Sequence, residues 1–337
     1  MTPAAIDWRA LPKVELHLHL EGAAPPALAR ARAEALGRDA AGLFDGIGGY
    51  AWRGFSGFLA AYERVAALFD TPEAQRELAE AVLAECARNG VIYAEVAISP
   101  DLAAGGDAGR WREHLAAIGE GAAAAEATHG IEARWIATCI RDLGPARARA
   151  CARLAVEAEE ARIVGLGLAG DERAGAPGDF RAAFALAREA GLGLTAHAGE
   201  FAGPESVRAA MADLDVDRID HGVRAFEDPD FLGDLAAMNR DAIDPHLAMC
   251  PGSNLALGVV GSLAEHPIGR VAWLDVSVST DDPPFFGTTM TREVEALAET
   301  FGWGEREVRR LQGNAAGAAF CDHETFLRVA AKLRGRV

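Results

Sequence analysis

The sequence predicts an α/β fold, a (β/α)8 barrel of the TIM type. Short apolar segments alternate with longer helical ones along the 337 residues, as expected for parallel strands covered by helices. Unusual polar residues follow the ends of several of these segments, where barrel enzymes carry their active sites. A doubly wound sheet is the alternative architecture. Because barrels of this length are commonly single domains, we expect one domain over residues 1–337.

The expected strands are near-continuous apolar runs, typical of parallel strands buried on both faces. Between them lie segments rich in Ala, Leu, Glu and Arg with helical spacing, such as 144–161 and 179–191. In chain order the eight strands are 14–20 (VELHLHL), 91–98 (VIYAEVAI), 131–140 (IEARWIATCI), 163–170 (IVGLGLAG), 192–199 (LGLTAHAG), 218–222 (RIDHG), 246–250 (HLAMC) and 275–280 (DVSVST).

The connection between the first and second strands is long, and its composition is helical. It contains the segments 55–69 (FSGFLAAYERVAALF) and 71–90 (TPEAQRELAEAVLAECARNG). A structureless loop of this length is uncommon in a compact domain, so we expect a helical insertion, or lid, over about residues 22–90. After the eighth strand, 291–303 and 326–337 predict extra C-terminal helices.

The charge and cysteine content restrict the possible partners and location. A formal net charge of −17 disfavours nucleic acid and anionic membrane surfaces as partners. No segment has the roughly 18 unbroken apolar residues of a membrane span, and residues 1–13 lack the basic start and apolar run of a signal peptide. The five cysteines form no CxxC pattern and suit a reducing compartment. We therefore expect a cytoplasmic protein, with no expectation for its oligomeric state.

Four histidines and two aspartates lie where the predicted strands end. His17 and His19 alternate along the first strand, so their side chains emerge on one face. Each residue alone has an ordinary explanation, such as a packed core histidine, a tight turn or a helix cap. Their convergence at one edge of a barrel favours a functional site instead. The other four follow the fifth, sixth and eighth strands: His197, His221, Asp281 and Asp282.

Three imidazoles and one carboxylate make a ligand set that suits Zn²⁺. We assign His17, His19, His197 and Asp281 as the ligands. Zinc would lower the pKa of a bound water from about 15.7 toward 7 and so supply hydroxide at neutral pH. Fe²⁺ or Co²⁺ could occupy similar ligands.

Two further residues are candidates for proton transfer. Glu200 lies three residues after His197 and can reach the site without being a ligand. A carboxyl acting as a general acid at neutral pH needs a pKa raised by burial or nearby negative charge. His221 could orient the hydroxide or take its proton. The alternative for Glu200 is a solvent-facing residue at a helix start.

Six motifs, taken in order, resemble the signature segments of the adenosine deaminase family, a branch of the amidohydrolase superfamily. The resemblance runs from about Leu11 to Phe286, and as an ordered set the motifs are highly specific. They are 12–23 (PKVELHLHLEGA), 167–172 (GLAGDE), 196–200 (AHAGE), 218–225 (RIDHGVRA), 250–254 (CPGSN) and 279–286 (STDDPPFF).

The resemblance implies a metal-dependent hydrolase barrel that releases ammonia from C6 of an adenine ring. Two-metal hydrolases of similar fold often bridge their ions with a modified lysine from the fourth strand. Here 163–170 contains no lysine, and the chain has only Lys13 and Lys332. We therefore expect one zinc per chain, and the family's ligands match the four residues assigned above.

The resemblance also implies roles for residues around the purine. Glu200 matches the acid that protonates ring N1, and His221 matches the residue that positions the attacking hydroxide. Asp282 matches a residue bonded to N7; because N7 only accepts, Asp282 should be protonated, which its acidic neighbour would favour. Gly170 matches a glycine whose backbone lies against N3, a close approach that the lack of a Cβ permits.

The substrate is where the chain departs from its relatives. Glu21 replaces the aspartate that contacts the ribose in vertebrate adenosine deaminases, and free-adenine deaminases also tend to carry Glu there. Ala97 stands where relatives often have Arg. The motif at 167–172 instead resembles that of the nucleoside enzymes. His19 and Glu21 are expected beside the substrate, and three residues of the insertion match apolar lid positions over the ribose: Phe55, Phe58 and Leu59.

We expect deamination of adenosine and 2′-deoxyadenosine to inosine and 2′-deoxyinosine. The alternative substrate is free adenine or a modified adenine nucleoside. A third possibility is a barrel that binds purines without catalysis, although none of the expected site residues is missing. Nucleotides are disfavoured by the acidic charge and the scarcity of lysine.

Overall fold

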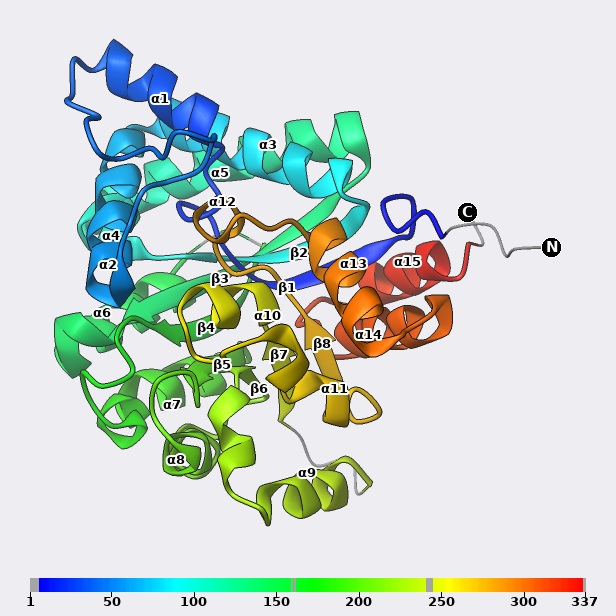
Figure 1. The fold of residues 1–337 in the computed structure, drawn as a ribbon. Coiled ribbons are helices and arrows are strands. Elements are labelled where there is room, and N and C mark those ends of the chain that lie inside the picture. Colours follow the sequence, from blue (N-terminus) through cyan, green and yellow to red (C-terminus); the bar gives the residue numbers. More distant parts are fainter. Residues whose placement is uncertain (1–5, 159, 161, 241–244, 336–337) are drawn as a thin grey trace.

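The structure is a computed structural model that describes residues 6–158, 160, 162–240 and 245–335. Eight parallel strands follow one another in chain order, each paired with the next, so the predicted barrel is confirmed (Figure 1). The predicted single domain extends to residues 1–5 and 336–337, which lie outside the described residues. The strands are β1 Lys13–His19, β2 Val91–Ile98, β3 Glu132–Ile140, β4 Ile163–Ala169, β5 Gly193–Ala198, β6 Arg218–His221, β7 His246–Met249 and β8 Val276–Val278.

The barrel closes between its first strand and the segment after its last. The backbone N–H of Asp281 donates to the carbonyl of His17 at 3.0 Å, and the N–H of His19 donates to the carbonyl of Asp281 at 3.1 Å. Leu18 and Asp281 form a parallel bridge in the same place. These bonds bring the two ends of the barrel sequence together at the level of the strand ends.

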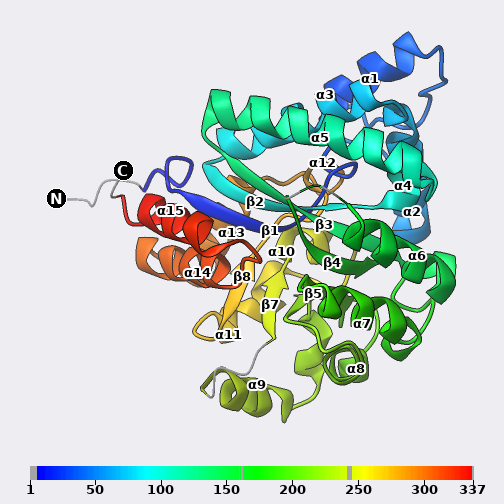
Figure 2. The same cartoon turned by 180° about the vertical axis from the view of Figure 1, so that it is seen from behind.

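Helices surround this barrel on its outside, as Figures 1 and 2 show from opposite sides. None of the helices formed by the described residues is both long and apolar enough to span a lipid bilayer. The α-helices are α1 Pro26–Ala35, α2 Gly54–Ala66, α3 Pro72–Arg88, α4 Pro100–Ala104, α5 Ala108–His129, α6 Gly144–Val156, α7 Arg181–Glu189, α8 Pro204–Leu214, α9 Phe231–Arg240, α10 Pro251–Ala256, α11 Ile268–Val271, α12 Pro283–Phe286, α13 Met290–Phe301, α14 Glu305–Gly317 and α15 His323–Leu333. The 3-10 helices are η1 Ala67–Phe69, η2 Arg141–Leu143, η3 Pro177–Phe180, η4 Val223–Glu227 and η5 Leu263–Glu265.

The helical insertion after β1 has two parts. Helix α3 packs against α5 on the outside of the barrel, beside β2 and β3 (Figure 1). Helix α1 lies at the outer edge of the molecule in Figure 1, and α2 lies below it, beside α4. Thr71 caps the start of α3 by accepting from the N–H of Ala74, and a proline follows at the first helical position. The cap marks the point where the chain turns from α2 into a helix that covers the barrel wall.

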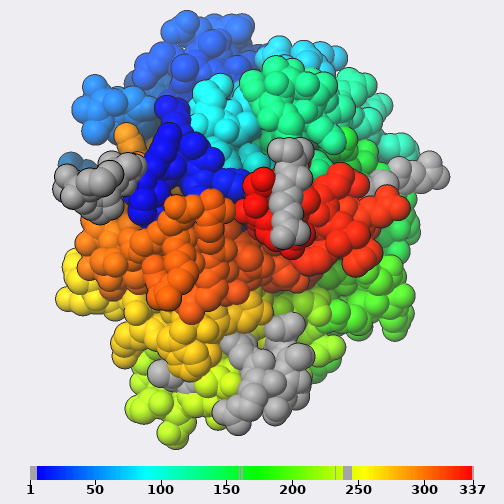
Figure 3. Space-filling view, turned by 90° about the vertical axis from the view of Figure 1, so that its right-hand side faces the viewer, coloured from blue at the N-terminus to red at the C-terminus, as the bar shows by residue number. Residues whose placement is uncertain are grey.

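The C-terminal helices are tied to the barrel by side-chain amides. Gln312 of α14 accepts from the backbone N–H of Val14 in β1 at 2.7 Å. Asn314 of the same helix donates to the carbonyls of Leu274 and Val276, beside β8. In Figure 3, the orange and red C-terminal helices accordingly lie beside the blue N-terminal residues. The predicted extra helices thus pack against the first and last strands.

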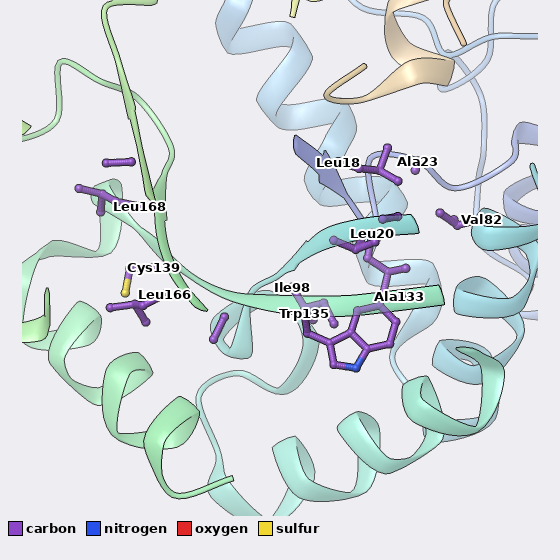
Figure 4. Packing of buried hydrophobic residues seen from close by; sticks show 14 of the residues in the cluster. Leu18, Leu20, Ala23, Val82, Ile98, Ala133, Trp135, Cys139, Leu166 and Leu168 are labelled. Carbon is purple, nitrogen blue, oxygen red and sulfur yellow. The ribbon is translucent and has the colours of Figure 1, made fainter. Parts of the chain in front are cut away.

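The main apolar core lies between the strands and the outer helices. Figure 4 shows part of it, with Trp135 of β3 beside Ile98 of β2, and Leu18 and Leu20 nearby. Trp135 is only 1% exposed, and these leucines are fully buried. Burying each such side chain contributes about 1.5–3 kcal/mol of transfer free energy, so the near-continuous apolar strands are explained by two buried faces.

The interior of the barrel also holds a buried ion pair. Arg218 of β6 donates to the carboxylate of Glu95 on β2 at 2.8 Å, and the Tyr93 hydroxyl donates to the other oxygen at 2.9 Å. The Arg218 guanidinium also lies 4.3 Å from the ring centre of Phe320. Because both charged side chains are at most 1% exposed, neither can recover a water shell when its partner is lost.

We predict that Glu95→Ala will lower the free energy of unfolding by about 3–5 kcal/mol, because it removes the hydrogen-bonded partner of the buried Arg218 charge and leaves it with the longer ion pair to Asp220 at 3.8 Å. Urea denaturation measures this loss. The control is Arg76→Ala, which removes an ion pair to Glu80 at 3.1 Å in which the side chains are 41% and 45% exposed. An exposed pair of this kind contributes about 0–1 kcal/mol. Equal losses in the two variants would contradict the prediction.

Candidate active site

A cavity opens where the strands end, and the sequence-predicted polar residues meet there. One wall carries imidazoles and carboxyls from β1, β5, β6 and the segment after β8; the other wall is largely apolar and includes side chains from α2. The lining residues are His19, Phe55, Phe58, Leu59, Tyr62, Glu63, Leu102, Ile140, Asp142, Leu143, Ala169, Gly170, His197, Glu200, His221, Leu257, Asp281 and Asp282.

Four histidines from three strands form a compact cluster. His17 and His19 end β1, His197 lies in β5 and His221 ends β6. The ring centres of the neighbouring pairs are 4.6–5.3 Å apart. His19 and His197 reach the cavity, whereas His17 lies below them and is 4% exposed. The expected convergence of the strand ends therefore occurs.

Asp281 is the acid at the centre of this cluster. Its Oδ1 lies 3.1 Å from His17 Nε2 and 3.2 Å from His19 Nε2, and its Oδ2 accepts from the Ser253 hydroxyl at 2.7 Å. Burial alone would raise the pKa of Asp281, but the imidazoles of His17 and His19 lower it well below its ordinary value. The side chain is thus an ionised, partly engaged carboxylate, which is the form that binds a cation.

The donor atoms form two overlapping groups that could hold a metal ion. His17, His197, His221 and Asp281 each offer one atom, and these atoms lie within 4.8 Å of one another; His19 groups with Asp281 and Asp282 by the same measure. The four ligands expected from the sequence fall in these two groups, which share Asp281, and their role as ligands stays a prediction. His221 is also close enough to compete for a coordination position.

Two of the site residues have an uncommon backbone conformation. His221 has φ 69° and Asp281 has φ 66°, in the left-handed region that non-glycine residues seldom adopt. Such a conformation costs about 1–3 kcal/mol and persists where surrounding bonds impose it. At Asp281 the surrounding bonds are the two backbone hydrogen bonds to His17 and His19 that close the barrel. Composition gives no signal for this feature.

Asp220 holds two of the imidazoles from behind. Its carboxylate lies 3.3 Å from His17 Nδ1 and 3.7 Å from His197 Nδ1, and it accepts from the Thr195 hydroxyl at 2.7 Å. Although burial opposes ionisation, His17 and His197 hold the pKa of Asp220 well below its ordinary value. Because an ionised carboxylate only accepts, the shorter contact favours Nδ1–H on His17 and leaves its Nε2 to face the cluster. The contact to His197 is too long for a hydrogen bond and acts through charge alone. The sequence analysis gave Asp220 no role, although it lies in the motif RIDHG.

Glu200 lines the cavity and is suited to act as an acid. Burial raises the pKa of its carboxyl well above the ordinary value, and the negative charges of Asp281 and Glu172 raise it further. Both causes shift the carboxyl toward its protonated form. This agrees with the direction expected for a general acid.

A second glutamate fixes the loop that carries Glu200. The carboxylate of Glu172 accepts from the four successive backbone N–H groups of residues 199–202 at 2.6–3.0 Å. It also accepts from the Ser206 hydroxyl in α8. Glu172 thus anchors the turn between β5 and α8. The sequence analysis quoted its motif, GLAGDE, but assigned a function only to Gly170.

Asp282 lies against a glycine that leaves room for it. A Cβ on Gly22 would be 1.5 Å from Asp282 Oδ1 and 2.8 Å from the Tyr62 ring, so no larger residue fits there. Burial raises the pKa of Asp282 well above its ordinary value, and Asp281 adds to the rise. The direction agrees with the protonated carboxyl that we expected, but burial rather than the acidic neighbour is the larger cause.

The remaining substrate residues divide into those that line the cavity and one that does not. Gly170, whose φ is 98°, lines the cavity. The three lid residues expected on α2 line it too. Glu21 is 2% exposed and does not line the cavity. Its Oε2 accepts from the Tyr62 hydroxyl at 3.2 Å, and burial raises the Glu21 pKa to about 7. Tyr62, which the sequence analysis missed, therefore occupies the cavity wall in front of Glu21.

Known proteins resemble this chain along nearly its whole length. Residues 12–335 match the family model described as adenosine deaminase. The adenine deaminase of Rhizobium leguminosarum bv. trifolii is 43% identical over 329 residues, which cover 96% of this chain and 99% of the relative. The adenine deaminase of Chelativorans sp. is also 43% identical, over 326 residues that cover 96% of this chain and 98% of the relative.

Solved structures show the same architecture. The adenine deaminase from Arthrobacter aurescens superposes with a TM-score of 0.85 at 29% identity, covering 97% of this chain and 99% of that chain. An amidohydrolase from Burkholderia ambifaria, described with bound Zn, superposes with a TM-score of 0.83 at 25% identity, covering 99% and 97%. The barrel with its added helices is thus shared along the whole chain.

We predict that Glu172→Gln will lower the free energy of unfolding by about 2 kcal/mol, because an amide N–H₂ would then face backbone donors that need an acceptor. Hydrogen exchange should also show loss of protection at residues 199–202. The matched control is Glu205→Gln, which alters an exposed side chain that accepts one N–H, that of Gly203, at 3.2 Å. If residues 199–202 stayed equally protected in both variants, Glu172 would not anchor the loop.

Proposed function

The chain belongs to the adenosine deaminase family, and we propose that it hydrolyses free adenine to hypoxanthine and ammonia. Its relatives share deaminase activity, as members of the amidohydrolase superfamily. The motifs led us to expect adenosine as the substrate, with free adenine as the alternative. We now adopt that alternative.

The observation that carries this choice is the identity of the relatives. Proteins matching nearly the entire chain at 41–44% identity are adenine deaminases, and so is a solved structure at 29% identity. Proteins this similar along their whole length are expected to have the same pocket, and therefore the same choice between a free base and a nucleoside. The expectation of adenosine rested on one short motif.

The cavity wall supports the smaller substrate. Away from the histidines its lining is mainly apolar, with side chains such as Phe58, Leu102 and Leu257. Glu63 and Asp142 also line the cavity, but ribose hydroxyls that faced the apolar side chains would lack hydrogen-bond partners, and each would cost about 1–3 kcal/mol. Glu21, the residue at the position that contacts ribose in nucleoside enzymes, is held by Tyr62 behind this wall. A planar base without a sugar places no hydroxyl against these side chains.

The motif that favoured a nucleoside has another explanation. Both oxygens of Glu172 in GLAGDE are engaged by backbone N–H groups of the Glu200 loop. Asp171 in the same motif pairs with Arg173 at 2.7 Å. Neither side chain lines the cavity. The motif therefore supports the acid's loop and carries no information about a sugar.

The residues present fit a single divalent cation. The nearby imidazoles outweigh burial and leave Asp281 ionised, and Asp220 lies behind His17 at 3.3 Å, which turns the Nε2 of that ring forward. His19 Nε2 faces the Asp281 carboxylate, and His197 lies beside both rings. These four ligands would hold one zinc per chain, the metal described in the Burkholderia relative. When bound, zinc supplies Lewis acidity and lowers the pKa of a coordinated water from about 15.7 toward 7.

The chain's own residues then divide the work on the base. Glu200, protonated in its buried position, donates its proton to ring N1 and makes C6 electrophilic. Asp282, also protonated, donates to N7, and the backbone of Gly170 lies along the N3 edge. His221 faces Glu200 across 3.7 Å and contacts the attacking water. Water adds to C6, and of its two protons one restores the Glu200 carboxyl and the other goes to the amino group. The amino group leaves as ammonia, C6 becomes a carbonyl, and N1 keeps the proton that Glu200 donated.

We predict that kcat/KM for adenine will exceed that for adenosine and 2′-deoxyadenosine by at least ~100-fold, because each unpartnered ribose hydroxyl costs about 1–3 kcal/mol. Ammonia release from a panel of the three compounds measures this difference. Faster turnover of adenosine would restore the first expectation. A protein that bound all three and released no ammonia would be a purine-binding barrel without catalysis.

We predict that Glu200→Gln will lower kcat by about 10²–10⁴-fold while one zinc per chain stays bound, because the amide cannot protonate N1 and the residue is not a ligand. Turnover is measured with adenine, and metal content by mass spectrometry. His17→Ala is the control, since it removes a ligand and should release the zinc. Unchanged turnover in Glu200→Gln would refute the assigned role.

A further inference from the structure

A chain of buried hydrogen bonds runs from a backbone amide to His221. Ile268 N–H donates to His266 Nδ1 at 3.2 Å, His266 Nε2 lies 3.1 Å from Asn254 Oδ1, and Asn254 Nδ2 lies 3.2 Å from His221 Nδ1. The three side chains are at most 1% exposed. Asn254 belongs to the motif CPGSN and His266 to the segment after it, and neither has a role in the reaction described above.

The first donor determines the direction of every later bond. A backbone N–H can only donate, so His266 Nδ1 accepts and the proton of this ring is on Nε2. That proton needs an acceptor, so Asn254 presents its oxygen to His266 and its N–H₂ to His221. Turning the amide round would put its N–H₂ against His266 Nε2–H, donor against donor. His221 Nδ1 therefore accepts, and the ring proton is on Nε2.

The other side of His221 is directed at the reacting atoms. Its Nε2 has no hydrogen-bond partner among the described residues and lies 3.7 Å from Glu200 Oε2. His221 also belongs to the group with His17, His197 and Asp281 whose donor atoms lie within 4.8 Å. A lone pair on Nε2 would make His221 a competing metal ligand. A proton there excludes coordination.

We propose that Asn254 and His266 are positioning residues that hold His221 as the Nε2–H tautomer. His221 then donates a hydrogen bond to the attacking water, is withheld from the metal and does not act as a base. The proposal rests on the proposed function in one respect, that water attacks C6 between His221 and Glu200. Burial lowers the pKa of both His221 and His266 to about 3, in agreement with one proton on each ring.

Asn254→Asp tests the proposal with almost no change of shape. A carboxylate only accepts, so it still receives His266 Nε2–H but now requires Nδ1–H on His221. Long-range ¹H–¹⁵N correlation spectra of the zinc-loaded, ¹⁵N-histidine-labelled protein report which nitrogen of each ring carries the proton. In the wild type we expect Nε2–H on both rings. In Asn254→Asp the His221 signals should interchange while those of His266 stay.

His246 provides a reference in the same spectrum. This buried histidine has Nδ1 3.0 Å from the Asp275 carboxylate and Nε2 2.8 Å from the Ser277 hydroxyl, so its proton should be on Nδ1 in both proteins. We also expect kcat for adenine to fall about 10²–10³-fold in Asn254→Asp with KM little changed, because a donor to the transition state is lost. A merely structural role would not interchange the His221 signals.

Nδ1–H on His221 in the wild type would overturn the proposal, and this result does not require the variant to fold. Unaltered His221 signals in a folded Asn254→Asp protein would overturn it too. Because the spectra need no substrate, they separate this proposal from the choice of adenine. A wild type with Nε2–H that fails to deaminate adenine would refute only the substrate.

Discussion

The site depends on one backbone contact, the pairing of Asp281 with β1. The same residue closes the barrel through its main chain and faces His17 and His19 through its carboxylate. Strand pairing therefore sets the distance between the acid and two imidazoles before any cation binds. This rigidity supplies what a metal site needs, ligands held in place by secondary structure rather than by the ion. The left-handed backbone at Asp281 is the local cost of that arrangement.

Around this contact, the environment separates four buried acids into two classes. Asp281 and Asp220 face imidazoles, which lower the pKa of both carboxyls, whereas burial raises the pKa of Glu200 and Asp282. Carboxyls a few ångströms apart are thereby suited to different roles, the first pair as anions and the second pair as donors. The ionised ones accept N–H groups and so fix which nitrogen of a ring carries the proton. Which atoms of the site donate and which accept hydrogen bonds therefore depends on these surrounding carboxylates as much as on the residues that would touch a substrate.

The strands and the polar cluster could be predicted from the sequence because both follow local rules. Apolar runs mark strands buried on two faces, and polar residues at their ends must meet at one edge. The residues that sequence reasoning missed depend on contacts between distant segments. Tyr62 meets Glu21 across 41 positions, and Glu172 meets the Glu200 loop across 28. The direction of a bond such as that between Asn254 and His266 is a further step removed, since it follows from a backbone amide and not from residue type.

The same distinction explains why the substrate was harder to infer than the chemistry. The residues that act on C6 lie at strand ends, where the barrel holds them whatever the substrate carries on its other side. The residues that would meet a sugar lie on α2 and the loops after β2, β3 and β7, such as Phe58, Leu102, Leu143 and Leu257. No motif constrains these positions, because an apolar wall needs only bulk. Motifs therefore identify the reaction, and the shape of the wall selects among the purines that can undergo it.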